Sequence, residues 1–131
     1  MISKQDTKTI LVVEDEKPLL EAIRITLEKD DFKVITARSA KDAYSLLESP
    51  EKIDVIWLDH YLLGKENGLD LVIKLKSQKQ YKNIPVFIVS NTASADKVKS
   101  YIRLGVNKYY TKANYRLDSI IGDIRDYLKT K

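Results

Sequence analysis

The chain has 131 residues, of which 44% are hydrophobic and 32% charged, with 23 lysine and arginine residues against 19 aspartate and glutamate residues. This length and composition predict one folded domain and exclude long disorder, and no apolar run approaches the about 20 residues that a membrane span requires. The absence of cysteine and the presence of one histidine exclude disulfides, thiolate metal sites and multi-histidine metal sites.

The N-terminal half of the chain alternates between apolar strand patterns and helical patterns. Residues 9–13 form a continuous apolar run that predicts a strand, and Pro18 fits the first turn of a helix after it. Residues 32–36 predict a second strand, followed by a helix that Ser39 caps and that stops near Pro50.

The C-terminal half repeats this alternation three more times. The predicted strands are 53–58, 84–89 and 106–111. Gly68 opens the helix after the first of these strands, and Gly105 ends the helix after the second. A final helix carries apolar residues on one face between Leu117 and Leu128.

This pattern predicts an α/β protein with a doubly wound, five-stranded parallel sheet and five helices. Three of the five predicted strands are nearly continuous apolar runs, which is typical of strands covered by helices on both faces. Right-handed crossovers leave two main strand orders, 2-1-3-4-5 and 3-2-1-4-5. In either order, ligands bind at the carboxyl ends of the strands, where the order reverses.

Reactive side chains follow four of the five predicted strands. Glu14 and Asp15 follow the first strand, Asp59 the third, Ser90 the fourth and Lys112 the fifth. Three carboxylates in one cleft repel each other, and a hard divalent cation such as Mg²⁺ relieves that repulsion. The set therefore fits phosphoryl transfer to one aspartate, with a hydroxyl and an ammonium group to hold phosphoryl oxygens.

Two enzymatic alternatives lack the residues that they need. A Ser-His-Asp hydrolase would require His60 beside Asp59 to serve Ser90, but the chain has no G-x-S-x-G turn. A phosphatase with an aspartate nucleophile would need an acid two residues after Asp59, where Tyr61 stands. His60 is therefore expected to be a polar loop residue beside the site.

The segments that carry these residues resemble the receiver domain of two-component response regulators, over essentially the whole chain. They are ILVVEDE, DVIWLDHYL, IPVFIVSN and GVNKYYTK. The resemblance implies a flavodoxin-like sheet of order 2-1-3-4-5 and a phosphoacceptor signalling switch in the cytoplasm. It also implies a protein that catalyses only its own phosphorylation and dephosphorylation and is otherwise not an enzyme.

The resemblance assigns a role to each site residue. Asp59 would accept a phosphoryl group from a phosphohistidine of a sensor histidine kinase or a histidine phosphotransfer protein. Asp15 and Asp59 would bind Mg²⁺ directly, Glu14 through water and Tyr61 through its backbone carbonyl, and Mn²⁺ could substitute. Lys112 would hold a phosphoryl oxygen.

The resemblance also implies how phosphorylation is read. Ser90 would hold another phosphoryl oxygen and shift toward the phosphate, and Tyr109 would follow it. This remodels the face built from the fourth helix, the fifth strand and the fifth helix, which a downstream protein reads. Homodimerisation of the phosphorylated form stays open. Neither a membrane nor nucleic acid is an expected partner, because the lysines are scattered among acidic residues.

Three positions depart from the family pattern. Ala113 follows Lys112 where proline is usual, Leu63 stands where proline is common, and Asn91 replaces a small residue after Ser90. A cis peptide before a residue other than proline costs about 2.5–4 kcal/mol, so the conformation at Lys112 is open. None of these departures removes a group that the reaction needs.

The length of the chain and its single series of strands and helices predict one domain. We expect one receiver domain over residues 1–131, with an ordered core of about 8–129 and no output domain. The alternative to a switch is a receiver-like scaffold that keeps the fold for protein interaction but is not phosphorylated.

Overall fold

A single parallel sheet forms the centre of the computed structural model, which describes residues 7–91 and 94–130. Its five strands have the order β2-β1-β3-β4-β5. The expected order 2-1-3-4-5 is therefore confirmed, and 3-2-1-4-5 is excluded. The strands are β1 (Thr9–Val13), β2 (Lys33–Ala37), β3 (Val55–Leu58), β4 (Val86–Ser90) and β5 (Lys108–Thr111).

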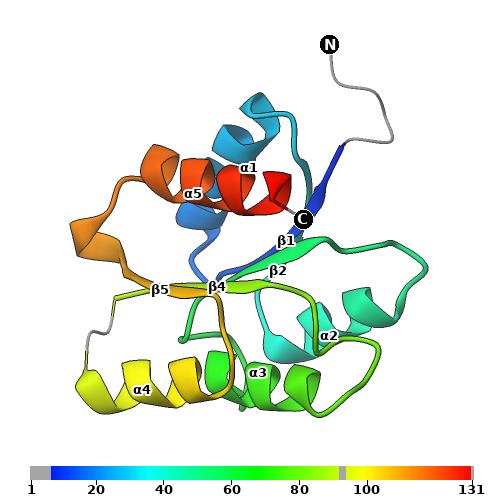
Figure 1. The fold of residues 1–131 in the computed structure, drawn as a ribbon, viewed down its shortest axis with the longest axis vertical. Helices are drawn as coiled ribbons and strands as arrows, with labels where there is room; N and C mark the ends of the chain where they lie inside the picture. The colour runs from blue at the N-terminus through cyan, green and yellow to red at the C-terminus, as the bar shows by residue number, and fades with distance from the viewer. Residues whose placement is uncertain (1–6, 92–93, 131) are drawn as a thin grey trace.

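Helices cover both faces of the sheet (Figure 1). Within the described ranges they are α1 (Lys17–Lys29), α2 (Ala40–Glu48), α3 (Gly68–Lys76), α4 (Ala95–Arg103) and α5 (Leu117–Lys129). α1 and α5 lie on one face, and α2, α3 and α4 lie on the other. None of these described helices is long and apolar enough to cross a bilayer.

Local sequence signals explain where the helices begin and end. Ser39 accepts a hydrogen bond from the backbone of Asp42 and caps α2 as predicted. Asn67 and Asp70 form a reciprocal capping box at the start of α3, which places Gly68 in the first helical position. Gly105, with φ of +90°, lies just beyond α4 in a conformation that favours glycine.

β1 begins at Thr9 as predicted, whereas β3, β4 and β5 begin later than predicted. β4 begins at Val86, because Pro85 has no N–H to donate to a neighbouring strand. β5 begins at Lys108, since the Asn107 side chain instead accepts a hydrogen bond from the Val86 backbone. The predicted strand starts at 53, 84 and 106 were therefore two residues too early.

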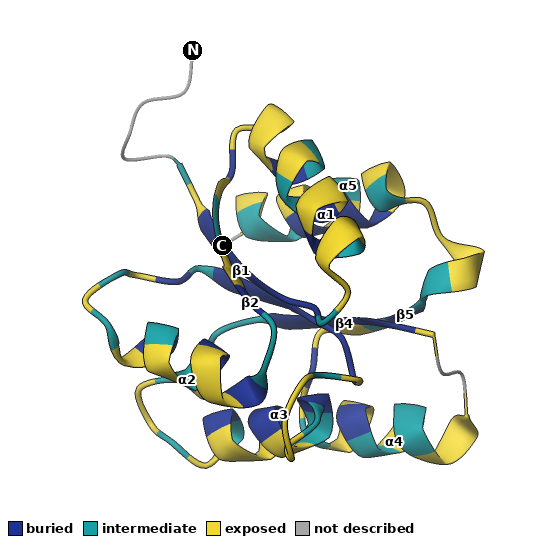
Figure 2. Ribbon diagram, turned by 180° about the vertical axis from the view of Figure 1, so that it is seen from behind, coloured by how far each residue is buried: buried dark blue, intermediate teal, exposed yellow. Residues whose placement is uncertain are grey.

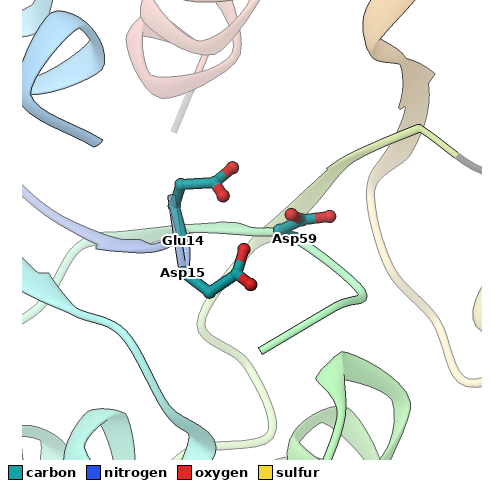
Figure 3. A group of neighbouring side chains, drawn as sticks. All are labelled: Glu14, Asp15 and Asp59. Carbon is teal, nitrogen blue, oxygen red and sulfur yellow. The ribbon is translucent and has the colours of Figure 1, made fainter. Parts of the chain in front are cut away.

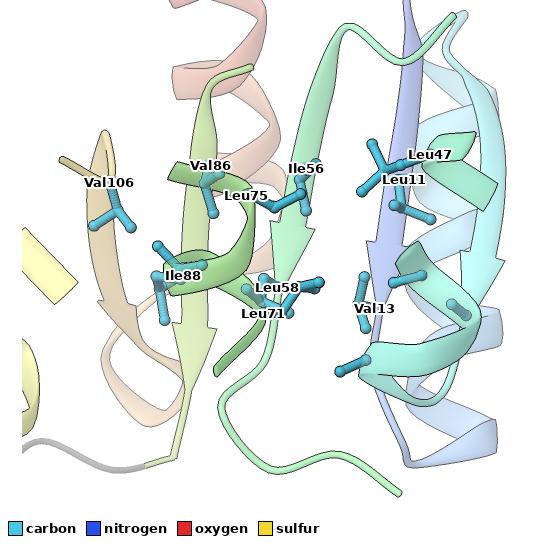
Figure 4. Packing of buried hydrophobic residues seen from close by; sticks show 14 of the residues in the cluster. Leu11, Val13, Leu47, Ile56, Leu58, Leu71, Leu75, Val86, Ile88 and Val106 are labelled. Carbon is cyan, nitrogen blue, oxygen red and sulfur yellow. The ribbon is translucent and has the colours of Figure 1, made fainter. Parts of the chain in front are cut away.

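The buried side chains of the strands alternate between two hydrophobic clusters, one on each face of the sheet. In Figure 2 the central strands are coloured as buried, and the helices that cover them carry both buried and exposed residues. In β3, Ile56 and Leu58 pack toward α2, α3 and α4, whereas Val55 and Trp57 pack toward α1 and α5. Figure 4 shows the first of these clusters, in which Leu71 and Leu75 of α3 cover the sheet. This double burial explains why the central strands are apolar throughout.

Candidate functional site

The register of the central strands brings the ends of β1 and β3 to the same level. Val13 pairs with Leu58, and the Asp59 N–H donates to the Val13 carbonyl over 2.9 Å. Glu14 and Asp59 therefore leave the sheet next to each other. On the other side of β3, Ser90 at the end of β4 pairs with Thr111, the last residue of β5.

Three carboxyl groups meet at this edge, as the positions after the strands predict (Figure 3). Glu14, Asp15 and Asp59 each offer one oxygen within 4.8 Å of the others. Glu14 and Asp59 are buried, and Asp15 is half-buried. An acidic group of this kind needs positive charge nearby, because buried carboxylates are costly when unpaired.

Lys112 supplies part of that charge. Its Nζ donates to Glu14 Oε1 over 2.7 Å and to Asp59 Oδ2 over 3.1 Å. The lysine side chain is 14% exposed. Burial lowers the pKa of Lys112, but the hydrogen bond to Glu14 and the charges of both acids outweigh burial and raise the pKa above its usual value.

The pKa of Glu14 departs strongly from its ordinary value. Burial raises the pKa of Glu14 to about 7, with the charge of Asp59 acting in the same direction, although hydrogen bonds from Lys112 and from the Glu16 backbone oppose the rise. The Glu16 N–H donates to Glu14 Oε2 over 3.0 Å. Lys112 thus neutralises only part of the negative charge of the three carboxylates.

The donor set fits a hard divalent cation. Asp59 Oδ1 is buried and has no hydrogen-bond partner among residues 7–91 and 94–130. Such an oxygen, together with the carboxylates of Asp15 and Glu14, is the ligand type that Mg²⁺ and Mn²⁺ prefer.

The hydroxyl groups of Ser90 and Tyr109 lie on the same side of the sheet as α3 and α4. Ser90 is fully buried, and Tyr109 is half-buried. Burial raises the pKa of Tyr109, and a side-chain hydrogen bond with Ser90 opposes the rise. The two residues are therefore in contact in this structure.

The loop segments with unusual sequence have defined conformations. All peptide bonds in the described ranges are trans, including the one between Lys112 and Ala113. Residues Lys112–Asn114 form a short 3₁₀ turn, which the strand and helix patterns did not predict. The Leu63 N–H donates to the Arg38 carbonyl over 3.0 Å, which ties the loop after β3 to the loop after β2.

Two residues near the site make contacts that the sequence did not predict. The Arg38 side chain donates two hydrogen bonds, of 3.0 and 2.7 Å, to the backbone carbonyl of Asp15. His60 lies in the loop beside Asp59 as predicted, but it is buried and hydrogen-bonded to Tyr101. Burial lowers the pKa of His60, and the charge of Lys97 acts in the same direction.

Comparison with known proteins identifies a family for this arrangement. The family model described as "Response regulator receiver domain" matches residues 10–124. The phosphate regulon transcriptional regulatory protein PhoB of Pseudomonas aeruginosa is 30% identical over 105 residues, which cover 80% of this chain and 45% of PhoB. A chemotaxis protein CheY homolog of Campylobacter jejuni is 31% identical over 106 residues, which cover 79% of each chain. The chain thus spans less than half of PhoB.

Solved structures give the same result. The Mn(2+)-bound form of response regulator Rcp1 has a TM-score of 0.80 at 27% identity, with 92% of this chain and 94% of that chain covered. The phosphorylated cyanobacterial phytochrome response regulator RcpA has a TM-score of 0.78 at 27% identity, with 92% and 91% covered. These relatives share the sheet and the helices that position the acidic group.

Proposed function

Because the chain belongs to the family of response regulator receiver domains of two-component signalling, we propose that it is a phosphoacceptor switch with Asp59 as the phosphorylated residue. The observation that carries this proposal is the meeting of Glu14, Asp15, Asp59 and Lys112 at one edge of the sheet. A scaffold that is never phosphorylated has no use for three crowded carboxylates, which lower its stability.

The proposed donor is a phosphohistidine of a sensor histidine kinase or a histidine phosphotransfer protein. An Asp59 carboxylate oxygen attacks the phosphorus atom, and an O–P bond forms as the N–P bond breaks. The electron pair of the broken bond stays on the imidazole nitrogen, which then takes up a proton. Lys112 is the proposed ligand of a phosphoryl oxygen, and its hydrogen bond to Asp59 supports this role.

The proposed cofactor is Mg²⁺, for which Mn²⁺ can substitute. Asp15 and Asp59 are the proposed direct ligands, with Glu14 acting through a water molecule and Tyr61 through its backbone carbonyl. When bound, the cation neutralises negative charge on the carboxylates and on the phosphoryl oxygens. The relative Rcp1 has a Mn(2+)-bound form, which supports a divalent cation as the cofactor.

Ser90 and Tyr109 are the proposed switch residues. Ser90 lies at the end of β4, where we expect its hydroxyl to bind a phosphoryl oxygen, and its contact with Tyr109 would link a movement of Ser90 to β5. The face formed by α4, β5 and α5 is thus the proposed reading surface for a downstream protein in the cytoplasm. The proposed reactions of the chain itself are the phosphorylation of Asp59 and the hydrolysis that reverses it.

Intact mass measurement tests this function. The protein is incubated with Mg²⁺ and a small-molecule phosphodonor such as acetyl phosphate, and we expect an adduct of about 80 Da. Asp59→Asn should abolish the adduct, whereas Asp126→Asn on the exposed face of α5 should not change it. An unmodified wild-type protein would favour the scaffold alternative, and an adduct that persists in Asp59→Asn would show that Asp59 is not the phosphorylated residue.

A further inference from the structure

A buried hydrogen bond joins the residue after Asp59 to α4. His60 Nδ1 lies 2.6 Å from the Tyr101 hydroxyl oxygen, across 41 positions of sequence. His60 is 5% exposed and Tyr101 is fully buried. In such surroundings a hydrogen bond is well shielded from water, and loss of one partner leaves the other unsatisfied.

The next residue of the same loop also contacts α4. The Lys97 ammonium group donates to the Tyr61 hydroxyl over 3.3 Å and lies 5.1 Å from the centre of the Tyr61 ring. Lys97 and Tyr101 are four residues apart and therefore lie on the same face of α4. The two consecutive loop residues thus hold one helix face at two successive turns. We call these four residues, His60, Tyr61, Lys97 and Tyr101, the α4 clasp.

The packing around the Tyr101 hydroxyl leaves it little freedom. A Cβ atom on Gly68 would lie 2.8 Å from this hydroxyl and 2.5 Å from the Asp59 carbonyl, so only glycine fits between the two. The Gly68 N–H donates to the His60 carbonyl over 2.8 Å, which fixes the loop backbone. The Tyr101 ring also lies 5.7 Å from the ring of Tyr109.

We propose that the α4 clasp is a second connection between Asp59 and α4, in which His60 and Tyr101 act as positioning residues. This rests on the proposed phosphorylation of Asp59. Because His60 and Tyr61 are the two residues that directly follow Asp59, a rearrangement of the Asp59 backbone moves both contacts to α4. The contact between Ser90 and Tyr109 begins at β4 rather than at the loop after Asp59, and it meets the clasp where the Tyr109 ring packs against Tyr101.

The variant Tyr101→Phe tests the proposal, because it removes the hydroxyl and keeps the ring. The matched control is Tyr44→Phe, which removes a hydroxyl that accepts a 2.6 Å hydrogen bond from Gln78 on the α2 and α3 side. Amide hydrogen exchange is measured over 95–103 with and without beryllofluoride and Mg²⁺, which together mimic the phosphorylated state. In the unmodified form, loss of one buried hydrogen bond should speed this exchange about fivefold.

The response to beryllofluoride shows whether Tyr101 couples α4 to Asp59 or only stabilises α4. Exchange over 95–103 should change with beryllofluoride in the wild type and in Tyr44→Phe, whereas Tyr101→Phe should lose most of this change. Tyr101→Phe should still form the phosphoryl adduct. If α4 of Tyr101→Phe responds to beryllofluoride as α4 of the wild type does, the clasp proposal is overturned and the proposed function stands. If the wild-type protein forms no phosphoryl adduct, both proposals are overturned.

A measurement on the wild type needs no variant. His60 is the single histidine of the chain, so its imidazole ¹⁵N resonances are unambiguous. Beryllofluoride binding should shift the Nδ1 resonance, because the hydrogen bond to Tyr101 changes its geometry. An unchanged Nδ1 resonance in protein saturated with beryllofluoride would contradict the proposal even if Tyr101→Phe did not fold.

Discussion

Lys112 Nζ lies 2.7 Å from Glu14 Oε1, so residues 98 positions apart in sequence form a buried ion pair beside Asp59. The side chain of Glu14 is fully buried in this pair. The lysine therefore holds two acids in place before any phosphoryl group or metal arrives. Its removal should affect both the chemistry and the charge balance of the site.

Lys112→Ala should slow phosphorylation of Asp59 by small phosphodonors on the order of 100-fold, because a positioned cation near the transferred group is lost. The rate follows from the adduct mass against time. Lys108→Ala is the control, since Lys108 is half-exposed and paired with Asp123 on the surface. A normal phosphorylation rate in Lys112→Ala would remove this residue from the mechanism.

Glu14 should make stability fall as pH rises. Its pKa is about 7 in the folded chain against an ordinary value of 4.5, so the folded state holds more protons between these values. The contribution is fully present below about pH 4.5 and is lost as pH rises to about 7, by on the order of 1–3 kcal/mol in total.

Urea unfolding of the wild type and of Glu14→Gln between about pH 4.5 and 7 measures the contribution of Glu14 to stability. The difference between the two proteins removes the effect of the other titrating groups. Glu66→Gln, in an exposed loop, serves as the control and should follow the wild type. Identical pH profiles for the wild type and Glu14→Gln would show that Glu14 titrates normally.

Mg²⁺ should stabilise the fold by binding the acidic group. At about ten times the dissociation constant the gain is about 1.4 kcal/mol by mass action. This corresponds to a rise in melting temperature of about 2–5 °C for a domain of this size. Thermal unfolding with MgCl₂ against NaCl at equal ionic strength measures the effect, and equal melting temperatures would count against a metal site.

Gly68→Ala should destabilise the chain by about 1–3 kcal/mol, because the added methyl group would overlap the Asp59 carbonyl and the Tyr101 hydroxyl. Gly122→Ala, within α5, should instead raise stability by about 0.5–1 kcal/mol, as its methyl group would meet only Arg125 at 3.6 Å. Chemical unfolding should show a lower free energy of unfolding for Gly68→Ala and a higher one for Gly122→Ala than for the wild type. Similar stability of both variants would argue against close packing at Gly68.

The sequence pattern was sufficient to predict which acids and which lysine gather at one edge. Glu14, Asp59 and Lys112 each follow a predicted strand, and in a parallel sheet all carboxyl ends share an edge. The pattern could not decide between two strand orders. That choice depends on which strands pair, here Val13 with Leu58, and pairing leaves no signal in a single strand.

Contacts made by loops were beyond the reach of sequence. Arg38 contacts Asp15 because the loop after β2 runs beside the loop after β1, and no local pattern records that path. Tyr101 fits a helical apolar face, but its hydroxyl reaches His60 only because α4 has one particular rotation against the sheet. Such contacts depend on tertiary packing rather than on spacing.

The division of the interior by the sheet has a consequence for how such a switch could tolerate change. Tyr101 and Tyr109 pack in the cluster beneath α3 and α4, while Trp57 packs in the cluster beneath α1 and α5. Rearrangement of Tyr101 and Tyr109 in the first cluster can therefore leave the packing around Trp57 in the second cluster unchanged. Substitutions in the cluster around Trp57 would then change mainly the free energy of unfolding. Substitutions around Tyr101 and Tyr109 would change mainly the conformational response to phosphorylation.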